Sequence, residues 1–170
     1  MSKRDLKKYL AELTKEQLEE QVLDLYTRFK PVKTYYNFVF KPNEQKLLDE
    51  AKFKIGKEYF PVNGRKPKAR RSVAQKIIKH FIQLGVEPFV IADVMLFNIE
   101  VALEYNAEKN IKQEAFYKSI FRSFEESVKY CKENGIVSDF NLRITTVLKT
   151  VNQQNWYNAE GFERSLKKLQ

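Results

Sequence analysis

Apolar side chains recur every three or four positions along most of this chain, and this helical period is the feature that most restricts its fold. The period marks seven or eight helical segments, which are separated by proline, glycine or capping residues. Nothing in the sequence indicates a sheet of any size. We therefore predict an all-α protein, packed as an orthogonal bundle or as a short solenoid-like stack of helical hairpins.

The first helices of this prediction begin at residues that cap helix N-termini. Ser2 precedes a short apolar stripe and can cap the first helix. Thr14, with Gln17 three residues later, has the spacing of a capping box for a second helix, which stops before Pro31. Asn43 can cap a third helix that continues to Pro61.

The segment 31–42 lies between the second and third helices and has a different pattern. Tyr36, Phe38 and Phe40 alternate with other residues, which is the period of an extended chain. We expect an extended arm whose aromatic side chains pin it across the core, with an exposed recognition strand as the alternative.

Two helical hairpins follow, about fifty residues apart. In the first, a helix from Ser72 ends at Gly85 and the next begins after Pro88. In the second, a helix over 111–133 ends at Gly135 and a further helix begins after 138–139. The offset fits a pair of repeated units, but any two hairpins with a glycine stop align in this way. The segment 156–169 reads as an amphipathic helix that closes one end of the core or forms a dimer contact.

Length and composition fit one ordinary globular domain over residues 1–170. The chain has 20.2 kDa, is 43% hydrophobic and contains only 5 Gly and 5 Pro, which excludes disordered and collagen-like classes. The N-terminus lacks the apolar stretch of a secretory signal, and no segment is long enough to span a bilayer. A single cysteine, Cys131, fits a reducing compartment. We expect a cytoplasmic protein without membrane association.

Positive charge is concentrated in one stretch of the chain. The net charge is +9, and residues 51–80 hold ten bases and one acid, Glu58, so the rest of the chain is balanced. Such a cluster attracts polyanions, with an affinity that falls as salt rises. The ten bases are Lys52, Lys54, Lys57, Arg65, Lys66, Lys68, Arg70, Arg71, Lys76 and Lys79.

The centre of this stretch, 61–67, holds two prolines and an Asn-Gly turn signal, so its bases lie on a loop. The loop leads into the helix that begins near residue 72, whose N-terminal amides favour an anion. We predict that these bases form a surface that binds nucleic acid or another polyanion, and that removal of Arg70 and Arg71 lowers the binding affinity. The alternative is a solvated loop that pairs with acids such as those at 16–20. The predicted phosphate contacts are Arg65, Lys66, Arg70 and Arg71, supported by Lys68, Lys76 and Lys79, with Tyr59 and Phe60 as candidates for base stacking or, alternatively, core residues.

Catalytic residues are scarce. The chain has one histidine, His80, and one cysteine, and it lacks metal-binding, phosphate-loop and nucleophile-elbow motifs, so we predict no cofactor, no metal and no enzymatic activity. A pair of His80 with Cys131 is an unsupported alternative. Asp93 and Glu100, seven apart on an apolar helix, are candidates for an acid and base pair. We favour a structural role, in which Asp93 and Asn98 satisfy neighbouring polar groups or Asp93 pairs with a base such as Arg70, Arg71 or Lys79.

The run 71–81 (RSVAQKIIKHF), with 59–64 before it and 89–98 after it, resembles a family of small uncharacterised bacterial proteins known only as a domain of unknown function. The resemblance covers nearly the whole chain. It implies a single bacterial domain of about this length, and it brings no activity, ligand or site residue with it.

Three functions from different classes are therefore open. The leading prediction is a non-enzymatic binding protein whose residues 52–80 form a basic surface for an anionic partner such as nucleic acid. The first alternative is a helical adaptor, in which the aromatic arm or the tail around Trp156 and Phe162 docks a protein partner or a second copy. The second is an enzyme that uses the carboxylates Asp93 and Glu100.

Overall fold

The computed structural model describes residues 1–62 and 64–167. Within these ranges the chain forms nine α-helices and no strand, which confirms the all-α prediction and exceeds the predicted number of helices. The helices are α1 (Lys3–Ala11), α2 (Lys15–Arg28), α3 (Lys30–Phe40), α4 (Glu44–Tyr59), α5 (Arg71–Leu84), α6 (Pro88–Lys109), α7 (Glu114–Glu133), α8 (Val137–Gln153) and α9 (Ala159–Lys167).

The helices belong to two compact units. The N-terminal unit, Met1–Asn43, holds α1 to α3, and the second unit, Glu44–Gln170, which we call the body, holds α4 to α9. The single domain over 1–170 stays a prediction.

The caps predicted at Ser2 and Thr14 are confirmed, and the cap at Asn43 stays a prediction. The Ser2 hydroxyl accepts a hydrogen bond from the Asp5 N–H at 3.2 Å, and the Asp5 carboxylate accepts one from the Ser2 N–H at 3.0 Å. Thr14 and Gln17 form the same reciprocal pair at 3.3 and 2.9 Å. Each pair satisfies backbone donors that a helix N-terminus leaves without partners.

The extended arm predicted over 31–42 is wrong, because residues 30–40 form α3. Pro31 stands in the first turn of this helix, where its missing N–H is not needed. The aromatic residues of this segment fit two periods. Tyr36, Phe38 and Phe40 stand two positions apart, as on one side of an extended chain, but Tyr36 and Phe40 are also four apart, which places them on one face of a helix. Their rings stack with centroids 6.2 Å apart.

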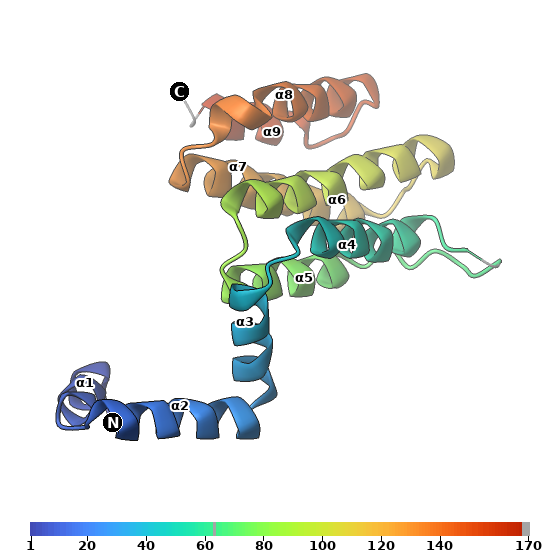
Figure 1. The fold of residues 1–170 in the computed structure, drawn as a ribbon. Coiled ribbons are helices and arrows are strands. Elements are labelled where there is room, and N and C mark those ends of the chain that lie inside the picture. The colour runs from blue at the N-terminus through green and yellow to red at the C-terminus, as the bar shows by residue number, and fades with distance from the viewer. Residues whose placement is uncertain (63, 168–170) are drawn as a thin grey trace. The chain divides into compact units, whose positions relative to one another are not determined.

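In the body, each helix packs against the next helix in the sequence, and α6 lies at the centre (Figure 1). Helix α6 packs against α4, α5, α7 and α8, and α9 packs against α7 and α8. Because α6 has neighbours on several sides, apolar residues occupy most of its circumference; Val94, Leu96, Ile99 and Ala102 are fully buried.

Three of the turns in the body share one backbone arrangement. Gly85, Gly135 and Asn155 have φ of 73°, 70° and 53°, the left-handed region that glycine adopts at least cost. In each turn the next residue donates its N–H to a carbonyl five residues back: Val86 to Phe81, Ile136 to Cys131 and Trp156 to Val151, at 3.0–3.1 Å. The two glycine stops predicted from the sequence are confirmed.

The C-terminal segment closes one end of the body. Trp156 is 4% exposed and Phe162 is fully buried, and their rings meet edge to face at 6.0 Å. Over its described part, 156–167, the segment completes the core; positions 168 and 169 of the predicted segment lie outside the described residues. The Trp156 and Phe162 side chains are therefore not free to dock a partner.

Candidate functional site

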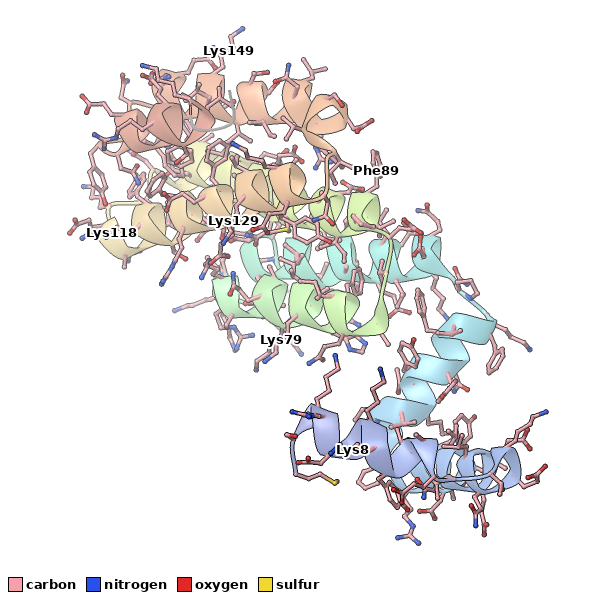
Figure 2. The ribbon with its side chains drawn as sticks, turned by 90° about the vertical axis from the view of Figure 1, so that its left-hand side faces the viewer. Lys8, Lys79, Phe89, Lys118, Lys129 and Lys149 are labelled. Atoms are coloured by element: carbon pink, nitrogen blue, oxygen red, sulfur yellow. The ribbon has the colours of Figure 1, made fainter. Side chains whose placement is uncertain are left out.

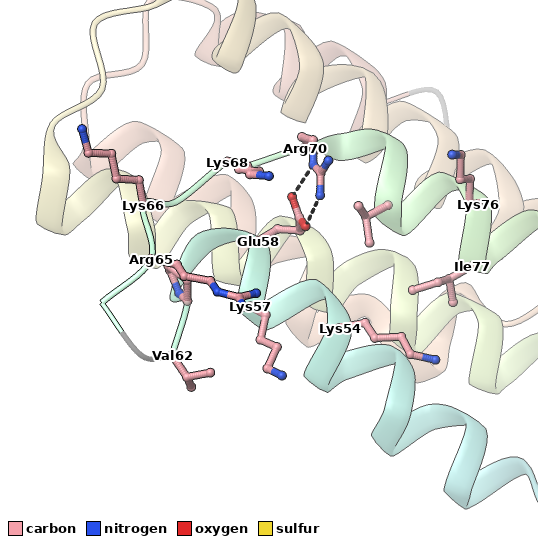
Figure 3. A pocket seen from close by; sticks show the side chains of 12 residues that line it. Lys54, Lys57, Glu58, Val62, Arg65, Lys66, Lys68, Arg70, Lys76 and Ile77 are labelled. Atoms are coloured by element: carbon pink, nitrogen blue, oxygen red, sulfur yellow. Dashed lines mark hydrogen bonds and ion pairs between the residues drawn. The ribbon is translucent and has the colours of Figure 1, made fainter.

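A basic groove lies between α4, α5 and the loop that joins them (Figure 3). Its volume is about 600 Å³. Seven bases line it: Lys54, Lys57, Arg65, Lys66, Lys68, Arg70 and Lys76. Glu58 is the one acid among the described lining residues, so the groove concentrates positive charge in a concave surface.

Glu58 holds the end of the loop in place. Its carbonyl oxygen accepts hydrogen bonds from the N–H groups of Lys68 and Ala69 at 2.9 and 2.8 Å. Its carboxylate accepts two hydrogen bonds from the Arg70 guanidinium, from Nε and Nη2, both at 2.8 Å. This bidentate pair and the two backbone bonds bring the chain back onto α4 just before α5 begins.

The Glu58 carboxylate is ionised at neutral pH. The hydrogen bond from Arg70 lowers its pKa below the ordinary 4.5, burial opposes this shift, and the charge of Lys68 adds to it. Since the pKa is lowered in the folded state, the stabilisation is complete above pH 4.5 and is lost as pH falls through the lowered value. The loop anchor is thus intact over the physiological range.

Five of the groove's bases form no ion pair among the described residues, and one of them, Lys57, lies against the Phe53 ring instead. Among the same residues, the other four are free of such a contact. In the part of the chain that the structure describes, no ion pair is formed by Arg65, Lys66, Lys68 or Lys76, and all four are exposed. Lys54 pairs with Glu50 at 3.3 Å on the surface of α4, which contributes little. These four bases are the cations best able to contact a bound anion.

Arg70 and Arg71, predicted as primary phosphate contacts, are instead engaged with carboxylates. Arg70 is held by Glu58 as described. Arg71 is only 19% exposed and pairs with Glu126 of α7, while its Nε donates to the Ser123 hydroxyl at 2.7 Å. Both arginines therefore connect elements of the body, and their role as primary phosphate contacts stays a prediction.

Five of the seven predicted contacts line the groove. Arg71 and Lys79 lie outside it and border a neighbouring hollow on α5, which Lys76 also lines. Lys79 projects from α5, as Figure 2 shows. Lys54 and Lys57 also line the groove, although they were not among the predicted contacts. They lie three apart on α4, so their side chains share one side of the helix.

The two candidates for stacking differ. Tyr59 is 1% exposed and its hydroxyl lies 3.4 Å from Asn98 Oδ1, so stacking by Tyr59 is wrong and its alternative as a core residue is right. Burial raises the pKa of its phenol well above the usual value. Phe60 is 36% exposed and meets Tyr105 edge to face at 5.9 Å, which leaves part of its ring accessible.

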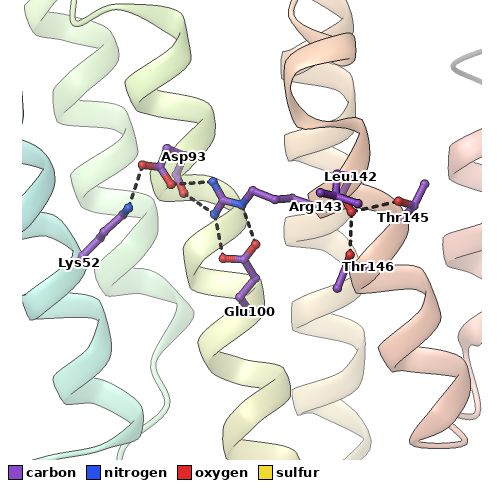
Figure 4. A network of polar contacts seen from close by, with 7 residues as sticks. All are labelled: Lys52, Asp93, Glu100, Leu142, Arg143, Thr145 and Thr146. Atoms are coloured by element: carbon purple, nitrogen blue, oxygen red, sulfur yellow. Dashed lines mark hydrogen bonds and ion pairs between the residues drawn. The ribbon is translucent and has the colours of Figure 1, made fainter.

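Asp93 and Glu100 are joined by Arg143 of α8 (Figure 4). The guanidinium donates to Glu100 at 2.7 and 2.8 Å and to Asp93 at 2.7 Å, and Lys52 of α4 also binds Asp93 at 2.8 Å. Burial pulls the pKa of Arg143 down, but its hydrogen bonds to both carboxylates outweigh the effect of burial and raise the pKa.

The predicted partners of Asp93, which were Arg70, Arg71 or Lys79, are therefore wrong. The network connects three helices of the body, and each carboxylate already accepts strong hydrogen bonds. This geometry suits a structural role; catalysis by these carboxylates stays a hypothesis.

The pair of His80 and Cys131 gains no support from the structure. His80 is exposed on α5, whereas Cys131 is fully buried in α7. Burial raises the pKa of the Cys131 thiol to about 11, so it is protonated at neutral pH and a poor nucleophile. Over residues 1–62 and 64–167, no cluster of His, Cys, Asp and Glu is arranged to hold a metal ion.

The fold and the groove define an all-α protein with a basic concave surface. The whole chain, residues 1–170, matches a family of unknown function, DUF6155, and the protein belongs to that family. No curated protein and no solved structure matches the chain. None of the described helices has the length and apolar character needed to cross a membrane.

Proposed function

We propose that this protein is a non-enzymatic binding protein whose basic groove holds the phosphates of a nucleic acid. The observation that carries this proposal is the set of four exposed bases, Arg65, Lys66, Lys68 and Lys76, which line one groove without acidic partners. A run of cations in a concave surface raises the local concentration of a polyanion and its rate of encounter. Nucleic acid presents several phosphates at once, which suits a groove with several cations.

The arrangement around the loop favours this function over a merely solvated basic loop. Glu58 is neutralised by Arg70, so the acid in the groove does not cancel the free cations. The same pair, with the two backbone bonds to the Glu58 carbonyl, holds the end of the loop in one position. Pre-positioned cations lose less freedom on binding than cations on an unanchored loop.

The groove predicts a salt-dependent affinity that depends on these four side chains. In the test variant, Arg65, Lys66, Lys68 and Lys76 are replaced by Gln, and binding to fluorescently labelled DNA and RNA is measured by anisotropy at several salt concentrations. We expect the affinity at low salt to fall at least about 100-fold. The slope of log K against log salt should flatten by about 3, since each lost phosphate contact removes about 0.7 to 0.9.

The matched control removes the same charge elsewhere on the body. Lys109, Lys112, Lys149 and Lys167 are exposed and do not line the groove; Lys149 projects from α8, apart from Lys79 of α5 in Figure 2. Their replacement by Gln should leave most of the affinity and slope unchanged. If both variants weaken binding equally, only net charge matters and the groove is not the site. If the unmodified protein binds neither DNA nor RNA at low salt, the function is refuted.

A second candidate function is self-association through the N-terminal unit, and we infer that its partner is a second copy. Helices α1 to α3 bury no residue, and nine large apolar side chains of the unit are 39% to 77% exposed. At roughly 100 Å² each they present on the order of 900 Å², close to the ~800 Å² per partner of a standard interface. The nine are Leu6, Tyr9, Val22, Leu23, Leu25, Phe29, Tyr35, Val39 and Phe40.

Charge also favours two copies. Helix α1 carries four bases against Asp5, which is used in its cap, whereas α2 carries four acids at 16, 19, 20 and 24 against Lys15 and Arg28. In a two-fold interface the basic helix of each copy can face the acidic helix of the other. A unit of 43 residues is also too small to bury a sufficient core alone.

Self-association predicts a dimer of the full chain that charged substitutions disrupt. We expect sedimentation to give a dimer at micromolar concentration, and Leu25→Glu with Phe29→Glu to convert it to a monomer. The control is Leu142→Glu, since Leu142 is 78% exposed on α8 of the body. A monomer for the unmodified chain over the same range would refute the inference.

Within the body, we infer a short stack of three hairpins, α4 with α5, α6 with α7 and α8 with α9. This pairing differs from the two hairpins predicted from the sequence, which correspond to α5 with α6 and α7 with α8. The contacts support this arrangement, because each hairpin packs mainly against the next one.

A further inference from the structure

An apolar hollow lies beside the basic groove, between α4 and α6. Its volume is about 360 Å³, and its large apolar lining residues are Phe53, Phe60, Val62, Phe97 and Val101. Phe53 is 60% exposed and Phe60 is 36% exposed, so aromatic rings are open to solvent here. Exposed aromatic side chains in a hollow are able to stack on planar ligands.

The hollow and the groove are adjacent. Lys57 and Val62 line both, so a ligand that extends past these two residues can reach from the groove to the hollow. The Lys57 ammonium lies 4.0 Å from the centroid of the Phe53 ring, which places a cation at the boundary against an aromatic face. A chain that alternates phosphates and planar rings can therefore place one kind of group in each part.

The two parts differ in their balance of charge. Among the described residues, seven bases and one acid line the groove, whereas one base, Lys57, and two acids, Glu100 and Glu104, line the hollow. Glu100 is bound by Arg143, and Glu104 is exposed and forms no ion pair among the described residues. A carboxylate repels a phosphate and accepts hydrogen bonds from the N–H groups of a base. The hollow thus favours bases over phosphates.

The geometry points to a single-stranded nucleic acid as the ligand, with phosphates in the groove and one or more bases against Phe53 and Phe60. This inference rests on the proposed function and adds the class of nucleic acid to it. In a duplex the bases are stacked on one another and paired, and only an unpaired strand exposes base faces to a protein. An aromatic hollow beside the phosphates contributes to binding only in that case.

Gly56 provides a way to test the hollow without disturbing the core. It lies on α4 and lines the hollow, and a Cβ built there would meet no atom within 4 Å. A methionine at this position therefore fits without a clash at its Cβ, and methionine favours a helix more than glycine does. Its side chain is expected to fill the hollow. Phe53→Leu with Phe60→Leu is the second variant, since leucine keeps apolar volume and removes the aromatic face.

The test compares the binding of three probes to the full chain by anisotropy: a single strand of about 12 nucleotides, its duplex, and a strand of the same length with abasic sites. About 12 nucleotides is within the usual site size of proteins that bind single strands. We expect the single strand to bind about tenfold more tightly than the abasic strand, and more tightly than the duplex. Gly56→Met and the double Phe→Leu variant should abolish the difference between single and abasic strands and leave their salt dependence unchanged. The control is Phe89→Leu, since Phe89 is 52% exposed on α6 outside the hollow.

The outcomes separate this inference from the proposed function. Equal affinity for the single strand, the abasic strand and the duplex would refute base binding in the hollow and leave phosphate binding in the groove intact. A preference for the single strand that survives both variants would also refute the hollow as its cause. The absence of binding to all three probes would refute the proposed function itself.

Discussion

Replacement of Arg143 by Met is expected to destabilise the body by about 3 kcal/mol. The substitution keeps most of the hydrocarbon stem and removes the charge that Asp93 and Glu100 share. The Asp93 side chain is 15% exposed, so water cannot fully replace the lost guanidinium. Breaking a buried ion pair on one side typically costs 3 to 5 kcal/mol, and the partial exposure of Arg143 places this case at the lower end.

Urea unfolding followed by the fluorescence of Trp156 measures this loss, because Trp156 is the single tryptophan and is buried in the body. Arg122→Met is the matched control, since Arg122 is exposed on α7, and it should change stability by less than about 0.5 kcal/mol. In a double-mutant cycle, Glu100→Gln should cost much less when Arg143 is already Met. Equal destabilisation by the two Arg→Met variants would show that the network contributes nothing specific.

Much of the helical layout could be predicted because its signals are local. The capping boxes at Ser2 and Thr14 and the stops at Gly85 and Gly135 need only the residues within a few positions of each turn. Helix α3 was mispredicted for the same reason: a run of aromatic residues with spacings of two and four fits either period. A local pattern of this kind cannot decide between an arm and a helix.

The candidate site could be predicted as a region but not as a set of contacts. The excess of bases in 51–80 is visible in the sequence, and most of the predicted residues line the groove. Which bases are neutralised depends on pairs between distant positions, such as Arg71 with Glu126, 55 residues away, and Asp93 with Arg143, 50 residues away. Such pairs are fixed by helix packing, and one sequence does not contain that information in readable form.

Asn106 is the centre of a second polar network, at the end of α6. Its Oδ1 accepts hydrogen bonds from the Ile111 N–H at 3.1 Å and from the Tyr117 hydroxyl at 3.2 Å. Its Nδ2 donates to Gln154 Oε1 at 2.8 Å, and that oxygen also accepts from the Trp156 indole at 2.9 Å. One buried amide therefore joins the end of α6, the start of α7 and the end of α8.

We expect Asn106→Ala to destabilise the body by about 2 to 4 kcal/mol, because it removes the acceptor of the Ile111 N–H and one hydrogen bond of the Gln154 amide oxygen in a largely dry environment. The Tyr117 hydroxyl keeps an acceptor, the Ile111 carbonyl oxygen. The same substitution at Asn98 is a control on the same helix: Asn98 is equally buried, but the hydrogen bond it accepts from Tyr59 is long, at 3.4 Å, so we expect a loss of about 1 kcal/mol. Urea unfolding of both variants, followed through Trp156, gives the comparison. If Asn98→Ala is as damaging as Asn106→Ala, the cost comes from the lost side-chain volume and not from the network.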